Sequence, residues 1–162
     1  MRRLKVYLDT SVISHLDAPD KPDWMEDTLR LWKHIQAGEY DLVLSEVVFE
    51  ELAKCDEQKK RYLATMLQQV QYRRVTTDKE TVELAGKFVD FGILNEKCLN
   101  DRRHIAAALL AGCDIIVSWN FKHIVNAKTI VGTRLITTSE GFKDVIICTP
   151  PTLAPDGGND DE

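Results

Sequence analysis

The chain has 162 residues, of which 44% are hydrophobic and 29% charged, as is ordinary for one globular domain with its own core. No apolar run approaches the roughly 20 residues that span a bilayer, and Met1–Lys5 leads into a strand rather than into the apolar core of a signal peptide. We therefore expect a cytoplasmic protein without a membrane segment. The net charge of −5 argues against a protein that binds nucleic acid over its whole surface.

Much of this net charge lies at the C-terminal end. Without Asp156, Asp160, Asp161 and Glu162, 22 of the 26 acidic residues remain against 21 basic ones. Such a nearly neutral body can carry local basic patches. The candidates are Lys59–Arg61, Arg73–Arg74, Arg102–Arg103 and Lys122–His123. We predict a folded domain over residues 1–149 and an acidic, disordered tail over 150–162, a segment rich in Pro, Gly and Asp.

The cysteines give no signal of a metal site or a disulfide. Cys55, Cys98, Cys113 and Cys148 lie far apart, with no Cys-x-x-Cys pair and no matching His spacing. We expect reduced and mostly buried thiols.

Short apolar runs alternate with longer runs of helical periodicity along the chain. The first strand is Leu4–Leu8, and Thr10 or Ser11 is the expected N-cap of the helical turn that follows it. The other predicted strands are Leu42–Leu44, Tyr72–Val75, Cys113–Trp119 and Val145–Cys148. The predicted helices run from Trp24 to Gly38, from Ser45 through Ala53, from about Asp56 to Val70, from Thr77 to near Gly92 and from near Asn100 to Gly112.

This alternation predicts a three-layer α/β/α sandwich around a mostly parallel sheet of about five strands. Ile115–Val117 is apolar at consecutive positions, which indicates a strand covered on both faces. In such sheets ligands bind in the crevice at the carboxyl ends of the strands. Polar residues that follow the strands are therefore the candidates for a functional site.

Acidic residues occupy several of these places. Asp9 follows the first strand, and Asp101 opens the helix before the fourth strand, although both could serve as helix caps instead. Glu50 and Glu51 lie in the helix after the second strand and project about 100° apart, so only one can face Asp9. We favour Glu51, because it lies beside the apolar positions of its helix, and expect Glu50 to be more exposed.

Two further groups extend this set. His104 shares a helix face with Asp101 at i,i+3, which allows a hydrogen bond or joint ligation. The fourth strand ends in Ser118 and Asn120, again polar groups where a strand meets a loop.

Four motifs in this order resemble the PIN-domain nucleases, including the VapC-type toxins of toxin–antitoxin pairs, over residues 4–148. They are Leu8-Asp9-Thr10-Ser11, Glu51-Leu52, Asp101-x-x-His104-Ile105-Ala106 and Ser118-Trp119-Asn120. The resemblance places the acidic site on Asp9, Glu51 and Asp101, with Asn120 at a fourth polar position. Many members have Asp at that position, so Asn120 removes one negative charge.

Phosphodiester hydrolysis is a reaction that requires such residues to lie close together. Carboxylates packed in one crevice repel one another, and Mg²⁺ or Mn²⁺ compensates them while activating water. We expect Asp9 and Asp101 to be principal metal ligands, Glu51 to be a ligand or a base that orients water, and Asn120 to act through a metal-bound water. The supporting or substrate-contacting candidates are Thr10, Ser11, Ser118, His104, Arg102 and Lys122.

The resemblance also implies a substrate and partners. It implies a metal-dependent endoribonuclease that leaves a 5′-phosphate and a 3′-hydroxyl on RNA. It further implies a homodimer and an antitoxin protein that fills the acidic crevice, often with an Arg. The apolar residues of the helix pair between Asp56 and Phe91 could form a dimer or antitoxin surface, but we favour plain core packing for them.

Two other classes of protein stay open. One is a PIN-like binding module that has weak or no catalysis. The other is a phosphotransferase that forms an aspartyl phosphate on Asp9, although such folds require a second Asp at the position of Ser11 and a Lys at the position of Asn120.

Overall fold

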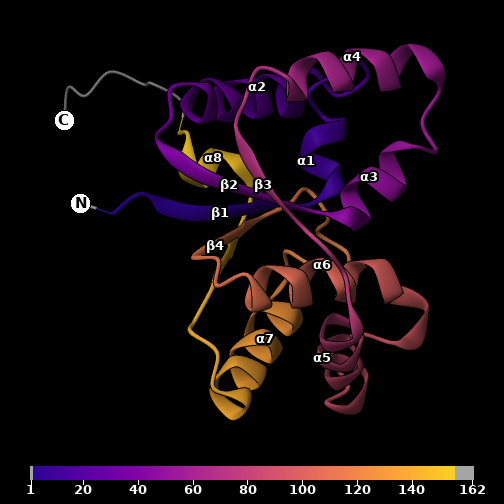
Figure 1. Cartoon of the computed structure of the whole chain (residues 1–162), viewed down its shortest axis with the longest axis vertical. Helices are drawn as coiled ribbons and strands as arrows, with labels where there is room; N and C mark the ends of the chain where they lie inside the picture. The colour runs from indigo at the N-terminus through magenta and orange to yellow at the C-terminus, as the bar shows by residue number, and fades with distance from the viewer. Residues whose placement is uncertain (1, 156–162) are drawn as a thin grey trace.

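Five parallel strands form a single sheet between two layers of helices in the computed structural model, which describes residues 2–155 (Figure 1). The strands are β1 (Leu4–Leu8), β2 (Tyr40–Ser45), β3 (Tyr72–Val75), β4 (Ile115–Val117) and β5 (Ile146–Cys148). Their order across the sheet is β3-β2-β1-β4-β5, and each pair is parallel. The predicted three-layer architecture is confirmed.

The strands are apolar at consecutive positions because both faces of the sheet are covered. In β1, Val6 and Leu8 belong to the core on one face, and Tyr7 belongs to the core on the other. All three side chains are fully buried. The carboxyl half of the central strand therefore lies wholly in the interior, and Asp9 follows it directly.

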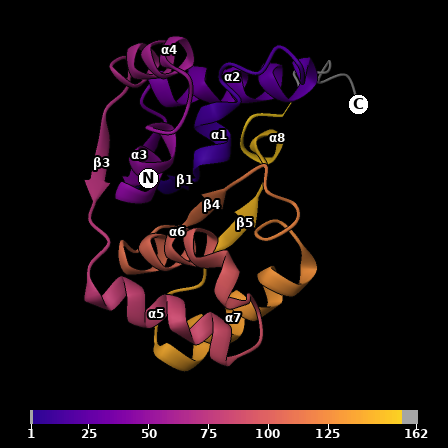
Figure 2. The same cartoon turned by 90° about the vertical axis from the view of Figure 1, so that its right-hand side faces the viewer.

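Each helical layer packs on its own side of the sheet (Figure 2). One layer consists of α1 (Thr10–Ser14), α2 (Pro22–Gln36), α3 (Glu46–Leu52), α4 (Glu57–Leu67) and α8 (Pro150–Leu153). The other consists of α5 (Lys79–Asp90), the 3-10 turn η1 (Glu96–Cys98), α6 (Leu99–Leu110) and α7 (Ala127–Glu140). Within residues 2–155, no helix is long and apolar enough to cross a membrane.

α4 and α5 do not form the expected helix pair, because β3 carries the chain from one layer to the other between them (Figure 2). Leu63 of α4 packs in one core and Phe88 of α5 in the other. Tyr62 and Phe91 are 42% and 49% exposed on these separate layers. A joint surface over Asp56–Phe91, the alternative to core packing, is therefore excluded.

The start of α1 also differs from the prediction. Its N-cap is Asp9, whose side chain makes no capping bond, and Thr10 and Ser11 are the first residues of the helix. The hydroxyl of Thr10 donates to Glu51, and that of Ser11 donates to Asp9. Both hydroxyls are thus turned toward the crevice instead of capping the helix. By contrast, Ser45 caps α3 as expected by accepting a hydrogen bond from the Val47 amide.

Residues 120–144, for which the sequence predicts no helix or strand, contain α7. Its buried positions have helical spacing but are mostly small or hydroxylated, whereas Val131 and Leu135 are exposed. The buried positions are Thr129, Gly132, Thr133, Ile136 and Thr137. A Cβ on Gly132 would lie 2.5 Å from the Cγ1 of Ile93. The buried face of α7 is therefore set by the close approach of its backbone to Ile93 and not by a stripe of apolar side chains.

The tail begins later than predicted. Pro150–Leu153 forms α8 against α2, Ala154 is fully buried, and the Tyr40 hydroxyl donates to the Leu153 carbonyl at 3.2 Å. The prediction of a disordered tail is thus wrong for residues 150–155, because these residues complete one core. Residues 156–162 lie outside the described part of the chain.

Candidate functional site

The candidate site, called the crevice below, is the group of polar side chains around Asp9, Glu51 and Asp101 at the carboxyl edge of the sheet, where the strand order reverses. From β1 the chain moves to β2 and β3 on one side, and β4 and β5 occupy the other side. The carboxyl ends of β1 and β4 are therefore neighbours at the topological switch point, where open α/β sheets bind ligands. Asp9 follows β1 and Ser118 follows β4, and the Asp9 amide donates to the Val117 carbonyl at 3.3 Å.

Asp9 is the most buried acid of the crevice, with 3% of its surface exposed. Its Oδ1 accepts the Ser11 hydroxyl at 2.5 Å, and its Oδ2 accepts the Ser118 hydroxyl at 2.8 Å. Burial raises the pKa of Asp9, and the opposing effects of His104 and the two hydroxyls do not cancel this rise. The carboxylate is therefore held in a fixed orientation but is costly to ionise without a nearby cation.

Glu51 lies across the crevice on α3, with 31% of its side chain exposed. Its Oε1 accepts the Thr10 hydroxyl at 2.7 Å and lies 2.7 Å from His104 Nε2. Burial opposes ionisation of Glu51, but these two hydrogen bonds outweigh it and hold its pKa below the ordinary value. Glu50 is half-exposed and pairs with Arg103 at 2.9 Å, so the expected orientation of the two neighbouring acids is correct.

A buried chain of hydrogen bonds fixes the ring of His104. The hydroxyl of Tyr7 lies 2.5 Å from His104 Nδ1 and 2.7 Å from Ser45 Oγ. Burial raises the pKa of Tyr7, so this hydroxyl keeps its proton and can donate it to Nδ1. That arrangement leaves the proton of a neutral imidazole on Nε2, facing Glu51. The expected contact of His104 with Asp101 is not formed, because the ring points to α3 instead.

Asp101, in the first turn of α6, is joined to Asp9 through residues that follow β4. Its Oδ1 accepts the Asn120 side-chain amide at 3.1 Å, and its Oδ2 lies 2.9 Å from His123 Nδ1. The backbone amide of Asn120 donates to Ser118 Oγ at 2.9 Å, and that hydroxyl in turn donates to Asp9. Asp9, Asp101 and Asn120 thus belong to one connected hydrogen-bond network, whereas Glu51 belongs to a separate one with Thr10 and His104.

The carboxyl groups of Asp9, Glu51 and Asp101 lie further apart than the ligand atoms of a compact metal site. Over residues 2–155, the only three potential ligand side chains with atoms all within 4.8 Å of one another are Cys98, Asp101 and His123. Sequence reasoning missed Cys98 and His123. The available signals were the spacings Cys98-x-x-Asp101 and Asn120-x-x-His123, which no local pattern joins.

The expectation that Arg102 contacts phosphate is wrong. Only 6% of this residue is exposed, and its guanidinium donates to the carbonyls of Ala85, Asn95 and Glu96 at 3.1, 3.2 and 3.1 Å. It fastens α5 and the η1 turn to α6. Lys122 is exposed on the loop after β4, where it can contact a ligand.

Replacing Arg102 by Ala is expected to destabilise the fold by about 3 kcal/mol or more, because one buried and two partly buried carbonyls lose a charged donor. The matched control is Arg103→Ala on the same helix, which breaks the pair with half-exposed Glu50 and should cost about 1 kcal/mol or less. Urea unfolding measures both changes. Similar losses for the two variants would contradict the assignment of Arg102 as a structural fastener.

A cavity of about 510 Å³ lies beside Cys98 and His123, the two neighbours of Asp101. It is bounded by apolar residues of the loop after α5 and by polar residues of the loop after β4. The polar residues around the cavity are Asn95, Glu96, Lys122, His123, Asn126, Lys128 and Thr129. Two lysines beside an acidic crevice can neutralise the phosphates of a bound polyanion.

Aromatic rings border the crevice on its other side. Trp24 and Trp119 stack with centroids 4.7 Å apart, and Lys21 Nζ lies 4.4 Å from the Trp24 ring centroid. Phe121 follows Asn120, lies 5.7 Å from Trp24 and is 48% exposed. An exposed ring next to the acids offers a surface on which a planar ligand can stack.

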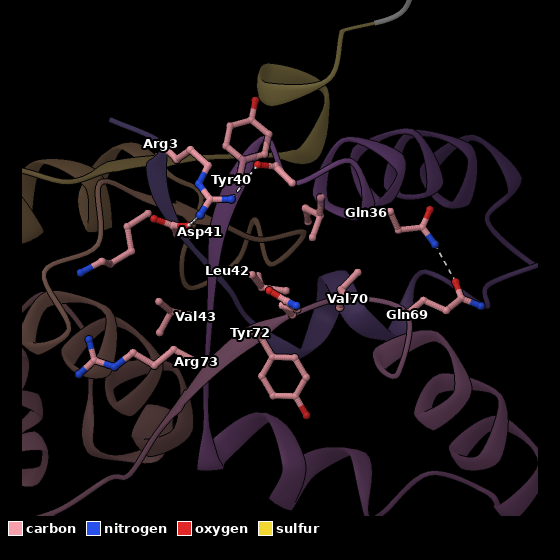
Figure 3. A pocket seen from close by; sticks show the side chains of 14 residues that line it. Arg3, Gln36, Tyr40, Asp41, Leu42, Val43, Gln69, Val70, Tyr72 and Arg73 are labelled. Atoms are coloured by element: carbon pink, nitrogen blue, oxygen red, sulfur yellow. Dashed lines mark hydrogen bonds and ion pairs between the residues drawn. The ribbon is translucent and has the colours of Figure 1, made fainter. Parts of the chain in front are cut away.

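A second cavity, of about 590 Å³, is remote from these groups (Figure 3). It lies at the amino ends of β1, β2 and β3, between Tyr40, Tyr72 and Arg73. Its polar side chains include the pairs Gln36–Gln69 and Arg3–Asp41, at 2.7 and 3.1 Å. Because the strands are parallel, this cavity opens at the edge opposite Asp9 and is no part of the candidate site.

Comparison with known proteins identifies the fold. No protein-family model and no curated protein sequence matches the chain. Among solved structures, it is similar to a chain of VapBC2 from Rickettsia felis, which was solved bound to a DNA fragment from the promoter of its genes, with 14% identity and a TM-score of 0.55. The match covers 90% of this chain and 98% of the other. The chain therefore has the PIN-like fold of the VapC-type proteins.

Proposed function

We propose that this protein is a metal-dependent endoribonuclease and the toxin component of a toxin–antitoxin pair. One observation carries the proposal: buried Asp9, at the switch point of a PIN-like sheet, is connected through Ser118 and Asn120 to Asp101. Glu51 reaches the same crevice through Thr10, the neighbour of Asp9.

The donor set fits Mg²⁺ or Mn²⁺. Asp9, Glu51 and Asp101 offer hard oxygen atoms, and within residues 2–155 no Lys or Arg forms an ion pair with any of them. Mg²⁺ keeps several waters, so these carboxylates can hold it without touching one another. The Asn120 side-chain oxygen accepts the His123 amide and retains a second lone pair for a metal-bound water.

The residues of the chain then have distinct tasks. A bound divalent ion supplies an acidified water and neutralises charge on the phosphate. Glu51, kept ionised by Thr10 and His104, can orient that water and accept its proton. Ser11 and Ser118 hold the Asp9 carboxylate in one orientation.

The direct test is cleavage of short single-stranded RNA by the purified full chain with Mn²⁺. We expect products with 5′-phosphate and 3′-hydroxyl ends, no cleavage after EDTA treatment, and none with Asp101→Asn purified in parallel as the control for contaminating nuclease. Equal cleavage by wild type and Asp101→Asn would reject the proposal. A folded wild type that cleaves nothing would favour the non-catalytic PIN-like binding module.

Exposed Phe121 is the proposed stacking residue for an RNA base. Phe121→Ala is expected to raise KM for single-stranded RNA about 5- to 150-fold, since a stacked base contributes about 1–3 kcal/mol. Phe121→Trp should retain binding. The control is Leu4→Ala, because Leu4 is similarly exposed but lies at the amino end of β1, at the opposite edge of the sheet. Steady-state kinetics with all three variants checks this, and an unchanged KM for Phe121→Ala would contradict it.

The antitoxin partner is part of the same proposal, since the structural neighbour is a VapBC complex. An acidic crevice without paired Lys or Arg can accept an Arg from a partner protein. The partner would therefore be a small protein with an exposed Arg, and its addition should stop RNA cleavage. The homodimer stays a prediction, which sedimentation of the purified chain measures.

A further inference from the structure

We infer that Cys98, Asp101 and His123 form a second metal site, which takes Zn²⁺ or another thiophilic transition metal. Their ligand atoms lie within 4.8 Å of one another. A thiolate, an imidazole and a carboxylate are the donors that zinc takes in proteins, whereas Mg²⁺ binds oxygen. The donor set thus separates this site from the oxygen-only set of Asp9 and Glu51.

Three parts of the fold bring these side chains together. Cys98 ends the η1 turn and is the N-cap of α6, and its side chain makes no capping bond. Its thiol donates only to Asn95 Oδ1, at 3.4 Å. Asp101 lies three residues further on the same helix, and His123 comes from the loop after β4, held by its amide bond to Asn120.

Small movements would complete the coordination. Ligand atoms around a tetrahedral zinc ion lie about 3.5 Å apart, and His123 Nδ1 and Asp101 Oδ2 are already 2.9 Å apart. The Cys98 thiol would lose its proton to solvent, and a neutral His123 would move its proton from Nδ1, which donates to Asp101 in the structure, to Nε2 so that Nδ1 can bind the ion. One proton is then released for each ion bound.

The cavity of about 510 Å³ gives this site access to solvent. Both Cys98 and His123 line it. Three protein ligands leave a fourth position in a tetrahedral site, and a water from this cavity can fill it. The ion can therefore enter without unfolding of α6.

Asp101 would be shared by the two metal sites, and this consequence rests on the proposed function. Zn²⁺ held by Cys98 and His123 takes the Asp101 carboxylate away from the Mg²⁺ or Mn²⁺ ion. Low concentrations of zinc should therefore inhibit RNA cleavage even with Mn²⁺ in excess.

Titration of the metal-free full chain with Co²⁺ tests the site without any assay of activity. Wild type is expected to show the charge-transfer absorption of a cobalt–thiolate bond, with one proton released per ion. Cys98→Ser should lose this absorption. The matched control is Cys55→Ser, which removes a free and more exposed thiol elsewhere in the chain and should keep it. Circular dichroism verifies that each variant is folded.

Two further variants locate the ion. His123→Ala, at a partly exposed side chain, should weaken Co²⁺ binding at least tenfold even if Cys98→Ser fails to fold. Asp9→Asn should leave the absorption intact. The inference is overturned if wild type shows no thiolate absorption, if Cys98→Ser retains it, or if Asp9→Asn abolishes it.

A measurement of inhibition separates this inference from the proposed function. In excess Mn²⁺, Cys98→Ser should need at least ten times more Zn²⁺ for half-inhibition of RNA cleavage than Cys55→Ser. Equal sensitivity of the two variants would show that zinc inhibits elsewhere. If the wild type cleaves no RNA, the proposed function fails while the Co²⁺ titration still decides whether the site exists.

Discussion

Glu51→Gln is expected to lower the rate of RNA cleavage at saturating Mn²⁺ at least 100-fold, the lower end of what a general base contributes. Glu50→Gln should change it less than about twofold. The two variants remove the same charge at adjacent positions of α3. The two side chains differ in the direction in which they point. Glu51 faces Thr10 and His104, whereas Glu50 pairs with Arg103 on the surface.

The stability of the two variants distinguishes a catalytic from a structural effect. The amide of Glu51→Gln can still accept hydrogen bonds from Thr10 and His104, so its melting temperature should stay within a few degrees of wild type. A large fall in melting temperature would mean that the loss of activity reflects unfolding. An equal loss of activity in both variants would remove Glu51 from the proposed mechanism.

The sequence was sufficient for the parts of the fold that follow from local periodicity. The consecutive apolar residues Val6–Leu8 favour a buried strand, and a strand there places Asp9 at its carboxyl end. Glu51 could be chosen over Glu50 because its position beside the apolar stripe of α3 is also local information. These predictions needed no knowledge of distant contacts.

The remaining features depend on contacts between distant segments. α7 escaped detection because its buried face consists largely of Thr and Gly, which pack against Ile93 of another segment. Arginine is mostly found at the protein surface. The burial of Arg102 is explained only by its hydrogen bonds to three carbonyls in and around α5 and η1. His123 could not be assigned to Asp101, because that pair joins α6 to the β4 loop.

Millimolar Mn²⁺ is expected to raise the melting temperature of wild type but not that of Asp9→Asn. At a metal concentration of 100 times Kd the gain is about 2.7 kcal/mol, or roughly 5–10 °C for a chain of this size. The control is Asp41→Asn, an acid at the opposite edge of the sheet that pairs with Arg3 (Figure 3). It should respond to Mn²⁺ as wild type does.

Without metal, Asp9→Asn should be more stable than wild type. Burial raises the folded-state pKa of Asp9, so the folded protein binds this proton more tightly than the unfolded chain does. Wild type therefore loses stability as the pH rises from the ordinary pKa of 3.8 through the raised one, and stays penalised above it. Asp9→Asn removes this penalty and keeps an acceptor oxygen for one of Ser11 and Ser118, while its NH2 group can donate to the hydroxyl of the other. At neutral pH it should therefore melt above metal-free wild type.

Thermal melts of both proteins in EDTA and in Mn²⁺, at neutral and acidic pH, check this crossover. A variant that is less stable than wild type in EDTA would mean that Asp9 stabilises the fold by its charge and is not a carboxylate awaiting a cation. A wild-type melting temperature that is indifferent to Mn²⁺ would mean that the crevice holds no divalent ion. Because neither measurement uses RNA, both outcomes test the metal requirement independently of the substrate.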